Sequence, residues 1–291
     1  MDPDVKIMFC AGTGGLVPEE RTLVKVAREF NRKSLPEDET SIDAIWKFRL
    51  EENPRLFNGT KFRVHSVVFD IDRKLTLNLG LTDYREYLGT NWASDVEQLR
   101  SRGQKDFSNP QAFFSDPMGV GAFVLTDDNH VVFLRRSLHC AEAPGMWDVP
   151  GGHAEPEELV GKIPVADVDY SQMTSQAVAH EIFDSILREI RDEVNISHTN
   201  LSPPLLMGIA QNTTSACRPS LEFLVGCSLS KDRVLALYRQ GDHAEADEST
   251  NIMLVPLSQI ITMETTNPTL WAQIAPSAKG CVILYKLCNG L

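Results

Sequence analysis

The sequence predicts a mixed α/β protein in which helices pack against a mixed sheet. Short apolar segments of strand length recur along the chain, most clearly where Gly119–Thr126 and Val131–Arg136 flank the turn Asp127-Asp128-Asn129. One long amphipathic helix is expected at Ser175–Asn195, because apolar residues recur there at helical spacing. Strands and helices also alternate through the second half of the chain, which favours helices packed on a sheet.

Residues 1–115 are expected to form a smaller α+β domain. Two apolar segments flank the turn Asp72-Arg73-Lys74 and predict a hairpin, and a later segment begins like a capped helix and stops at a glycine. The elements expected here are strands at Val5–Cys10, Arg63–Phe69 and Leu75–Leu81, helices over Ile42–Leu50 and Leu81–Thr90, and two more short helices up to about Ser115.

Residues 116–291 are expected to form the second, larger domain. Its long helix carries the apolar seam Val178, Ile182, Ile186, Ile190 and Val194. Around this helix and the hairpin we expect strands at Leu205–Gln211, Leu221–Leu229 and Ile252–Val255, a helix at Lys231–Gln240, and a last helix that begins at Pro268–Ala275.

Composition restricts the class of protein. With 291 residues, 42% of them hydrophobic, the chain is long enough to bury a core, and no apolar run reaches the roughly 18 residues of a membrane span. A net charge of −12 argues against nucleic-acid and anionic-membrane partners. The start lacks a signal-peptide pattern, and the six cysteines include no C-x-x-C pair, so we expect a cytosolic protein with reduced thiols, the nucleus being an open alternative. The sequence does not indicate the oligomeric state.

Three acids share one face of the long helix. Glu189, Asp192 and Glu193 stand at positions i, i+3 and i+4, which are neighbours on a helix surface. Carboxylates crowded in this way repel one another unless a cation lies between them, and carboxylate oxygens are the ligands that Mg²⁺ prefers. The pattern therefore indicates metal-assisted chemistry on a phosphorylated small molecule.

Two segments together resemble a known family motif. Pro150-Gly151-Gly152-His153-Ala154-Glu155-Pro156-Glu157-Glu158 and Arg188-Glu189-Ile190-Arg191-Asp192-Glu193-Val194-Asn195-Ile196 are similar to the two halves of the Nudix box, G-x5-E-x7-R-E-U-x-E-E-x-G-U, where U is a bulky aliphatic residue. The resemblance covers roughly residues 116–291. It implies the Nudix α/β/α sandwich with a mixed sheet and Mg²⁺-dependent hydrolysis of a diphosphate.

The motif departs from the family pattern in three places. Residues 159–187, 29 in all, separate Glu158 from Arg188 where the pattern has seven. This insertion, at about 159–180, leaves open whether Glu158 or a helix acid such as Glu181 takes the first acidic position. Asp192 replaces a glutamate, and Asn195 replaces a glycine but also tolerates the left-handed conformation at a helix end.

Local strings narrow the resemblance to family members that cleave nucleotide sugars. Leu81-Thr82-Asp83-Tyr84-Arg85, Leu88-Gly89-Thr90-Asn91-Trp92, Ala141-Glu142-Ala143-Pro144-Gly145 and Pro276-Ser277-Ala278-Lys279-Gly280 carry it. It implies a hydrolase that converts UDP-glucose or UDP-galactose to UMP and the sugar 1-phosphate. Two alternatives stay open: a Nudix diphosphatase for another substrate, such as ADP-ribose or a dinucleotide, and a non-catalytic module that binds nucleotide sugars.

The resemblance also assigns roles to residues. Glu189 and Glu193 are the expected ligands of Mg²⁺, with Mn²⁺ as an alternative ion and Asp192 as a third or outer ligand, and Arg188 is expected to orient a neighbouring glutamate. Strand alternation sends Arg135 and Arg136 to opposite faces. Glu248 is a candidate catalytic base. The expected substrate-binding residues, with the N-terminal domain acting as a lid, are Phe57, Tyr84, Arg136, Ala141, Asp148, His153, Glu155 and Ser277.

Overall fold

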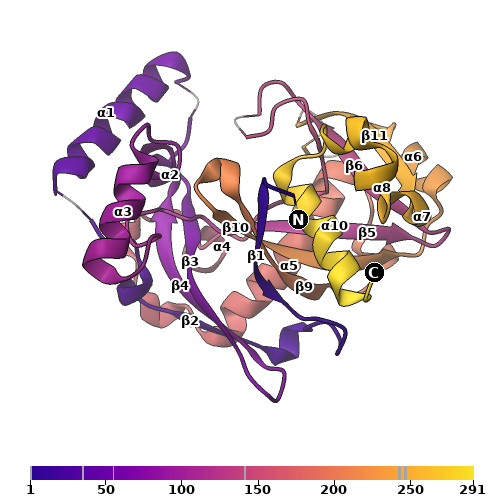
Figure 1. Cartoon of the computed structure of the whole chain (residues 1–291), viewed down its shortest axis with the longest axis horizontal. Helices are drawn as coiled ribbons and strands as arrows, with labels where there is room; N and C mark the ends of the chain where they lie inside the picture. The colour runs from indigo at the N-terminus through magenta and orange to yellow at the C-terminus, as the bar shows by residue number, and fades with distance from the viewer. Residues whose placement is uncertain (1, 35, 55, 141, 242–243, 246–247) are drawn as a thin grey trace.

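A large mixed sheet and a smaller three-stranded sheet form the framework of the protein, with helices packed around both (Figure 1). The structure is a computed structural model, and it describes residues 2–34, 36–54, 56–140, 142–241, 244–245 and 248–291. Ala141, an expected substrate contact, lies outside the described residues. Among the described residues, no helix is both long enough and apolar enough to cross a bilayer.

The large sheet has the order β1-β9-β10-β5-β6-β11, with β7 paired to β6 and β8 paired to β5. Strands β10 and β5 run parallel, and the other described pairs in this sheet are antiparallel. Its strands are β1 (Val5–Cys10), β5 (Gly119–Thr126), β6 (His130–Arg136), β7 (Trp147–Asp148), β8 (Gly151–His153), β9 (Leu205–Asn212), β10 (Arg218–Cys227) and β11 (Ser249–Pro256).

Helices cover both faces of this sheet. The apolar seam of α5 is fully buried on one face, and on the other α10 packs Tyr285 against Phe123 of β5, with ring centroids 4.2 Å apart. This is the expected α/β/α sandwich. The helices are α1 (Pro36–Glu52), α2 (Tyr84–Thr90), α3 (Val96–Phe107), α4 (Glu157–Val160), α5 (Ser175–Val194), α6 (Lys231–Tyr238), α7 (Leu257–Ile260), α8 (Met263–Thr266), α9 (Pro268–Trp271) and α10 (Pro276–Cys288).

The small sheet, in the order β2-β4-β3, lies beside the large one (Figure 1). Its strands are β2 (Thr22–Val26), β3 (Thr60–Phe69) and β4 (Leu75–Asp83). The insertion joins it to α5: Arg28 donates to the carbonyl of Ala166 at 3.1 Å, and Val168 and Met173 are buried in the shared core. The insertion is therefore a packed connection between the two sheets.

Three expectations need adjustment. Strand β1 pairs with β9 in the large sheet, so it lies across the expected division at residue 115, which otherwise stays a prediction. Between residues 91 and 115 one α-helix, α3, is present where two were expected, because Asn109–Asp116 forms turns that bond to the buried side chain of Arg63. The segment at Pro268 ends after one turn, and the last helix begins at Pro276.

Candidate functional site

Helix α5 carries the carboxylates expected at the site. Its first turn is capped by Thr174, whose side chain accepts a hydrogen bond from the backbone N–H of Ala177, and it ends at Asn195 in the expected left-handed conformation, with φ 67°. The buried apolar seam fixes the rotation of the helix about its axis. Glu181, Glu189 and Glu193 consequently lie under the short strand β8.

Backbone N–H groups of the glycine-rich segment hold these carboxylates. Gly151 donates to Glu193 at 2.8 Å and His153 donates to Glu189 at 3.1 Å. A Cβ atom at Gly152 would overlap the Glu189 carboxylate, and one at Gly151 would overlap the carbonyl of Val120 on β5. The glycines are therefore needed for β8 to pair with β5 and at the same time to pack against α5.

The loop before β11 adds two further acids. The backbone N–H of Glu245 donates to the carbonyl of Asp192 at 2.9 Å, which attaches this loop to the end of α5. Carboxylate oxygens of Glu193, Glu245 and Glu248 lie within 4.8 Å of one another. Together with Glu189, these residues are called the acid cluster below.

Burial and like charges raise the pKa values of Glu189, Glu193 and Glu245. Burial is the main cause of the increase in the pKa of Glu193, well above its ordinary value, and the charge of Glu189 adds to it. Burial, followed by the charge of Glu245, raises the pKa of Glu189 to about 7, and burial with the charge of Glu248 raises that of Glu245 to about 7. Carboxylates whose ionised forms are destabilised in this way suit a divalent cation, which would neutralise them.

The other motif residues have structural contacts. Arg188 donates to Glu181 at 2.7 Å and to Asp184 at 2.6 Å, and its role in orienting a glutamate for the reaction stays a prediction. Glu181 is buried and also accepts from the backbone of Glu155, whereas Glu158 is exposed on α4, so of these two acids Glu181 is the one in contact with the glycine-rich segment.

Asp192 lies apart from the group of three close carboxylates. Both of its oxygens accept hydrogen bonds from Arg191 at 2.7 Å. The structure brings Glu245 into the position in which the sequence placed Asp192 as a third ligand. The ligand assignment of Asp192 receives no support from this geometry, because its charge already has a partner.

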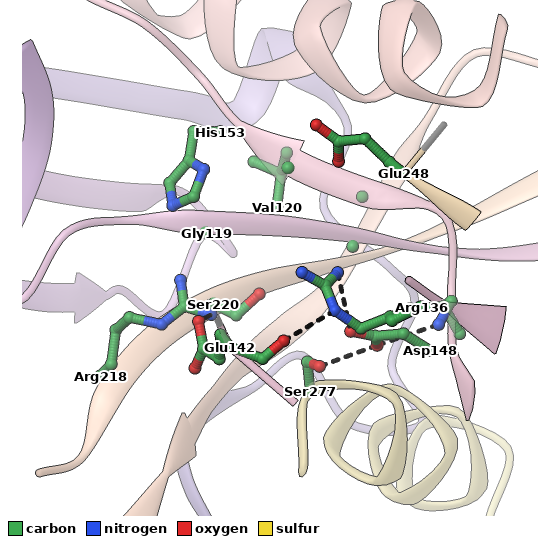
Figure 2. A pocket seen from close by; sticks show the side chains of 14 residues that line it. Gly119, Val120, Arg136, Glu142, Asp148, His153, Arg218, Ser220, Glu248 and Ser277 are labelled. Atoms are coloured by element: carbon green, nitrogen blue, oxygen red, sulfur yellow. Dashed lines mark hydrogen bonds and ion pairs between the residues drawn. The ribbon is translucent and has the colours of Figure 1, made fainter. Parts of the chain in front are cut away.

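A cavity of about 240 Å³ opens beside the acid cluster, and four expected substrate residues line it: Arg136, Asp148, His153 and Ser277 (Figure 2). Arg136 lies 3.6 Å from Asp148, which accepts a hydrogen bond from Ser277 at 2.8 Å. Arg135 points to the other face, where it packs on Trp147. Burial tends to lower the pKa of Arg136, but Asp148 and other nearby carboxylates raise it overall, so this guanidinium stays charged.

His153 is neutral at physiological pH. Burial, with the positive charges of Lys61, Arg218 and Arg136, holds the pKa of the imidazole well below its usual range. A neutral ring donates one hydrogen bond and accepts another.

Three further expected contacts do not line this cavity, and their assignment to the substrate stays a prediction. Phe57 is 59% exposed, with Lys162 over its ring. Tyr84 is half-buried and packs against Trp46 and Tyr87. The carboxylate of Glu155 pairs with Lys61 of the small sheet.

Sequence reasoning missed four polar residues at the site. Glu142, Arg218 and Ser220 line the cavity, and Glu245 belongs to the acid cluster. Arg218 and Ser220 alternate along β10 opposite Gly119 of β5, and only this pairing of strands distant in sequence brings them to the cavity. One feature of the sequence could have indicated Glu245: it stands three residues before Glu248 in an acidic segment.

Comparison with known proteins places the chain in a family. No family model matches it. Over the whole chain it is 44% identical to the human uridine diphosphate glucose pyrophosphatase NUDT22, of which it covers 95%. It is 34% identical to Nudix hydrolase 9 of Arabidopsis thaliana, over 79% of this chain and 76% of that protein. A MutT protein from Methanosarcina mazei Go1 is 17% identical over 60% of this chain and 93% of that one, with a TM-score of 0.35. The chain therefore belongs to the Nudix hydrolase family.

Proposed function

We propose that the protein hydrolyses the diphosphate of UDP-glucose and UDP-galactose to UMP and the sugar 1-phosphate. The observation that carries the proposal is the acid cluster beside a cavity that also contains a charged arginine, Arg136. The relatives named UDP-glucose pyrophosphatases, which the chain matches over its whole length, support this substrate class. In the reaction water adds to one phosphorus atom, and the bond from that phosphorus to the bridging oxygen breaks.

The proposed cofactor is Mg²⁺, which Mn²⁺ could replace. Glu189 and Glu193 of α5 and Glu245 of the loop would hold it. Carboxylate oxygens of Glu193 and Glu245 lie within 4.8 Å of each other, and the charge of Glu189 contributes, after burial, to the raised pKa of Glu193. When bound, such an ion polarises phosphoryl oxygens and lowers the pKa of coordinated water.

The proposed base is Glu248. It is exposed and lines the cavity, so water can reach it beside the bound diphosphate. A general base must be within hydrogen-bond reach of the attacking water. Arg188 and Glu181 act indirectly: Arg188 pairs with Glu181, which also accepts from the backbone of Glu155 just after β8 and so holds that segment against α5.

The proposed substrate contacts divide along the cleft. Arg136 would bind the diphosphate as a charged fork, and neutral His153 would donate a hydrogen bond to it. Asp148 and Ser277, already bonded to each other at 2.8 Å, would bind hydroxyl groups. The half-buried ring of Tyr84 and the exposed ring of Phe57 would stack on uracil. Glu155 and Ala141 are the remaining proposed substrate contacts.

The substrate is a small molecule. A net charge of −12 disfavours nucleic acid as a partner, and we infer a cytosolic location from the sequence features given above.

The test is direct. Purified protein with UDP-glucose and Mg²⁺ should release UMP and glucose 1-phosphate in equal amounts, and an excess of chelator should stop the reaction. Absence of UMP with either Mg²⁺ or Mn²⁺ would overturn the proposal.

A further inference from the structure

Arg218, the first residue of β10, is a buried cation with unused hydrogen-bond donors. Only 7% of the residue is exposed. Its Nη2 pairs with Glu142 at 3.1 Å, while Nε and Nη1 are buried and have no hydrogen-bond partner among the described residues. Burial tends to lower the pKa of this guanidinium, but Glu142 and other groups raise it overall, so Arg218 is charged.

Unused buried donors of this kind are costly to a folded protein. The guanidinium fits here only because residue 119 is glycine: a Cβ atom at Gly119 would lie 2.7 Å from Nη1 of Arg218. Both residues line the cavity, and Figure 2 shows the guanidinium of Arg218 beside the carboxylate of Glu142. A donor kept unpaired in a cavity wall indicates a ligand that supplies the acceptor.

The two arginines of the cavity have different surroundings. The charge of Glu193 is one of the causes that raise the pKa of Arg136, so Arg136 faces the acid cluster. Glu142 and Asp148 act on both guanidinium groups, but Tyr87 and Glu222 are among the main influences on Arg218 and not on Arg136. Arg136 thus serves the end of the cleft that would hold the diphosphate, and Arg218 serves another part.

Aromatic residues identify the part that Arg218 serves. The rings of Tyr84 and Tyr87 lie 6.3 Å apart, and that of Trp92 lies 5.1 Å from Tyr87. Tyr84 is also close enough to Glu142 for that carboxylate to contribute, after burial, to its raised pKa. Arg218 therefore lies between the cavity and a cluster of aromatic side chains that includes Tyr84, the residue proposed above to stack on uracil.

We propose that Arg218 is a specificity-determining residue that donates a hydrogen bond to a ring carbonyl of uracil at its 4-position. Uracil has a carbonyl acceptor there and cytosine has an amino group, and a guanidinium has donors only. Arg218 would then bind uracil and repel cytosine. This inference rests on the proposed function, since it names the group that selects the base of that substrate.

The carboxylate of Glu142 fixes the position of Arg218. Its other oxygen accepts from Asn212 at 3.0 Å and from Ser215 at 3.1 Å, so three described side chains hold the acid in place. These contacts limit the orientations that the guanidinium can take. A rigid donor discriminates between an acceptor and a donor on the base better than a mobile one.

The test compares UDP-glucose with CDP-glucose in steady-state assays of wild type and Arg218→Met. For UDP-glucose, kcat/KM should fall at least about tenfold through KM, with kcat within about threefold. For CDP-glucose, kcat/KM should stay within about threefold or rise. The ratio of UDP-glucose to UDP-galactose activity should not change, because both substrates have the same base.

A second variant covers the case in which Arg218→Met does not fold because Glu142 is left unpaired. The double variant Arg218→Met/Glu142→Gln removes both charges and should give the same loss of base selectivity. Arg135→Gln, an arginine on the opposite face that packs on Trp147, is the matched control and should behave as wild type.

An equal loss for both bases, or a change in the glucose-to-galactose ratio without a change in base selectivity, would overturn the role of Arg218. These failures differ from failure of the proposed function, which would appear as a wild-type protein that does not hydrolyse UDP-glucose.

Discussion

Two clusters of charged side chains in the described part of the chain differ in their hydrogen bonds. The first, called the joint cluster below, contains Arg63 and Asp116 with Asn91 and Gln111, where the small sheet meets the large one. Arg63 donates to three backbone carbonyls at 2.7–2.9 Å. Asp116 accepts from Asn91 at 2.9 Å and from Gln111 at 3.1 Å, and Arg63 lies 3.9 Å away.

The acid cluster has the opposite character. Its members are all acids, and the charge of Glu189 contributes, after burial, to the raised pKa of Glu193. Asp116 is also buried, which raises its pKa to about 6, but the next largest influence there is the opposing charge of Arg63. The comparison teaches that a buried charge satisfied by its own chain holds the fold together, whereas like charges left together mark a place for a ligand.

The largest expected effect concerns activity. Glu193→Gln should lower kcat by at least about 100-fold, because loss of a cation ligand should cost more than loss of the groups around it. The free energy of unfolding without cation should stay the same or rise, because a repelling charge is removed. Steady-state kinetics and urea unfolding measure both, and exposed Glu158→Gln is the control that should keep full activity. Full activity of Glu193→Gln would refute its role.

For the joint cluster we expect the reverse, namely a loss of stability with little change in activity. Arg63→Met should lower the free energy of unfolding by about 3–5 kcal/mol, because Asp116 is left as a buried charge without its cation. Molecules that remain folded should keep their kcat within about twofold. Urea unfolding checks this, and Arg63→Met/Asp116→Asn should recover part of the loss. A loss below about 1 kcal/mol would show that the joint cluster does not stabilise the fold.

A smaller effect is expected at Gly152, the glycine of β8 that lies against the carboxylate of Glu189. Gly152→Ala should lower kcat/KM by about 10–100-fold, because the added Cβ would displace the Glu189 carboxylate. Gly226→Ala is the matched control: it also lies in a strand, and the nearest atom to its Cβ would be 3.4 Å away. Equal activity of the two variants would show that the position of Glu189 is not important.

The smallest expected effect depends on pH. The raised pKa values of Glu189 and Glu245, about 7 each, mean that the folded state keeps protons that the unfolded state loses near the ordinary value of 4.5. Stability without cation should therefore fall as pH rises from about 4.5 to 7. At a fixed concentration of ten times its Kd at pH 8, Mg²⁺ should raise Tm by about 2–4 °C at pH 8 and by less at pH 5.5, where protons compete for the carboxylates. An equal increase at both pH values in thermal unfolding would contradict this.

Local patterns of the sequence predict much of this fold. The apolar seam of α5 and the alternation along β5 and β6 follow from periods of 3.6 and 2, so the helix that carries Glu189 and Glu193 could be predicted. The pairing of β1 with β9 could not, because contacts between distant segments decide it. Glu245 and Arg218 reach the site through such contacts. Helical spacing places Asp192 beside Glu189 but does not reveal its pairing with Arg191, so its part as a third ligand stays a prediction.

The central claim is that Glu193 and Glu245 help to bind a divalent cation. Its most direct test is titration of the protein with Mn²⁺, with binding measured by calorimetry or by electron paramagnetic resonance of the free ion. The account predicts that wild type binds Mn²⁺, that Glu193→Gln and Glu245→Gln weaken binding at least about tenfold, and that Asp192→Asn binds as wild type does. Unchanged binding by Glu193→Gln, or loss of binding by Asp192→Asn alone, would contradict it.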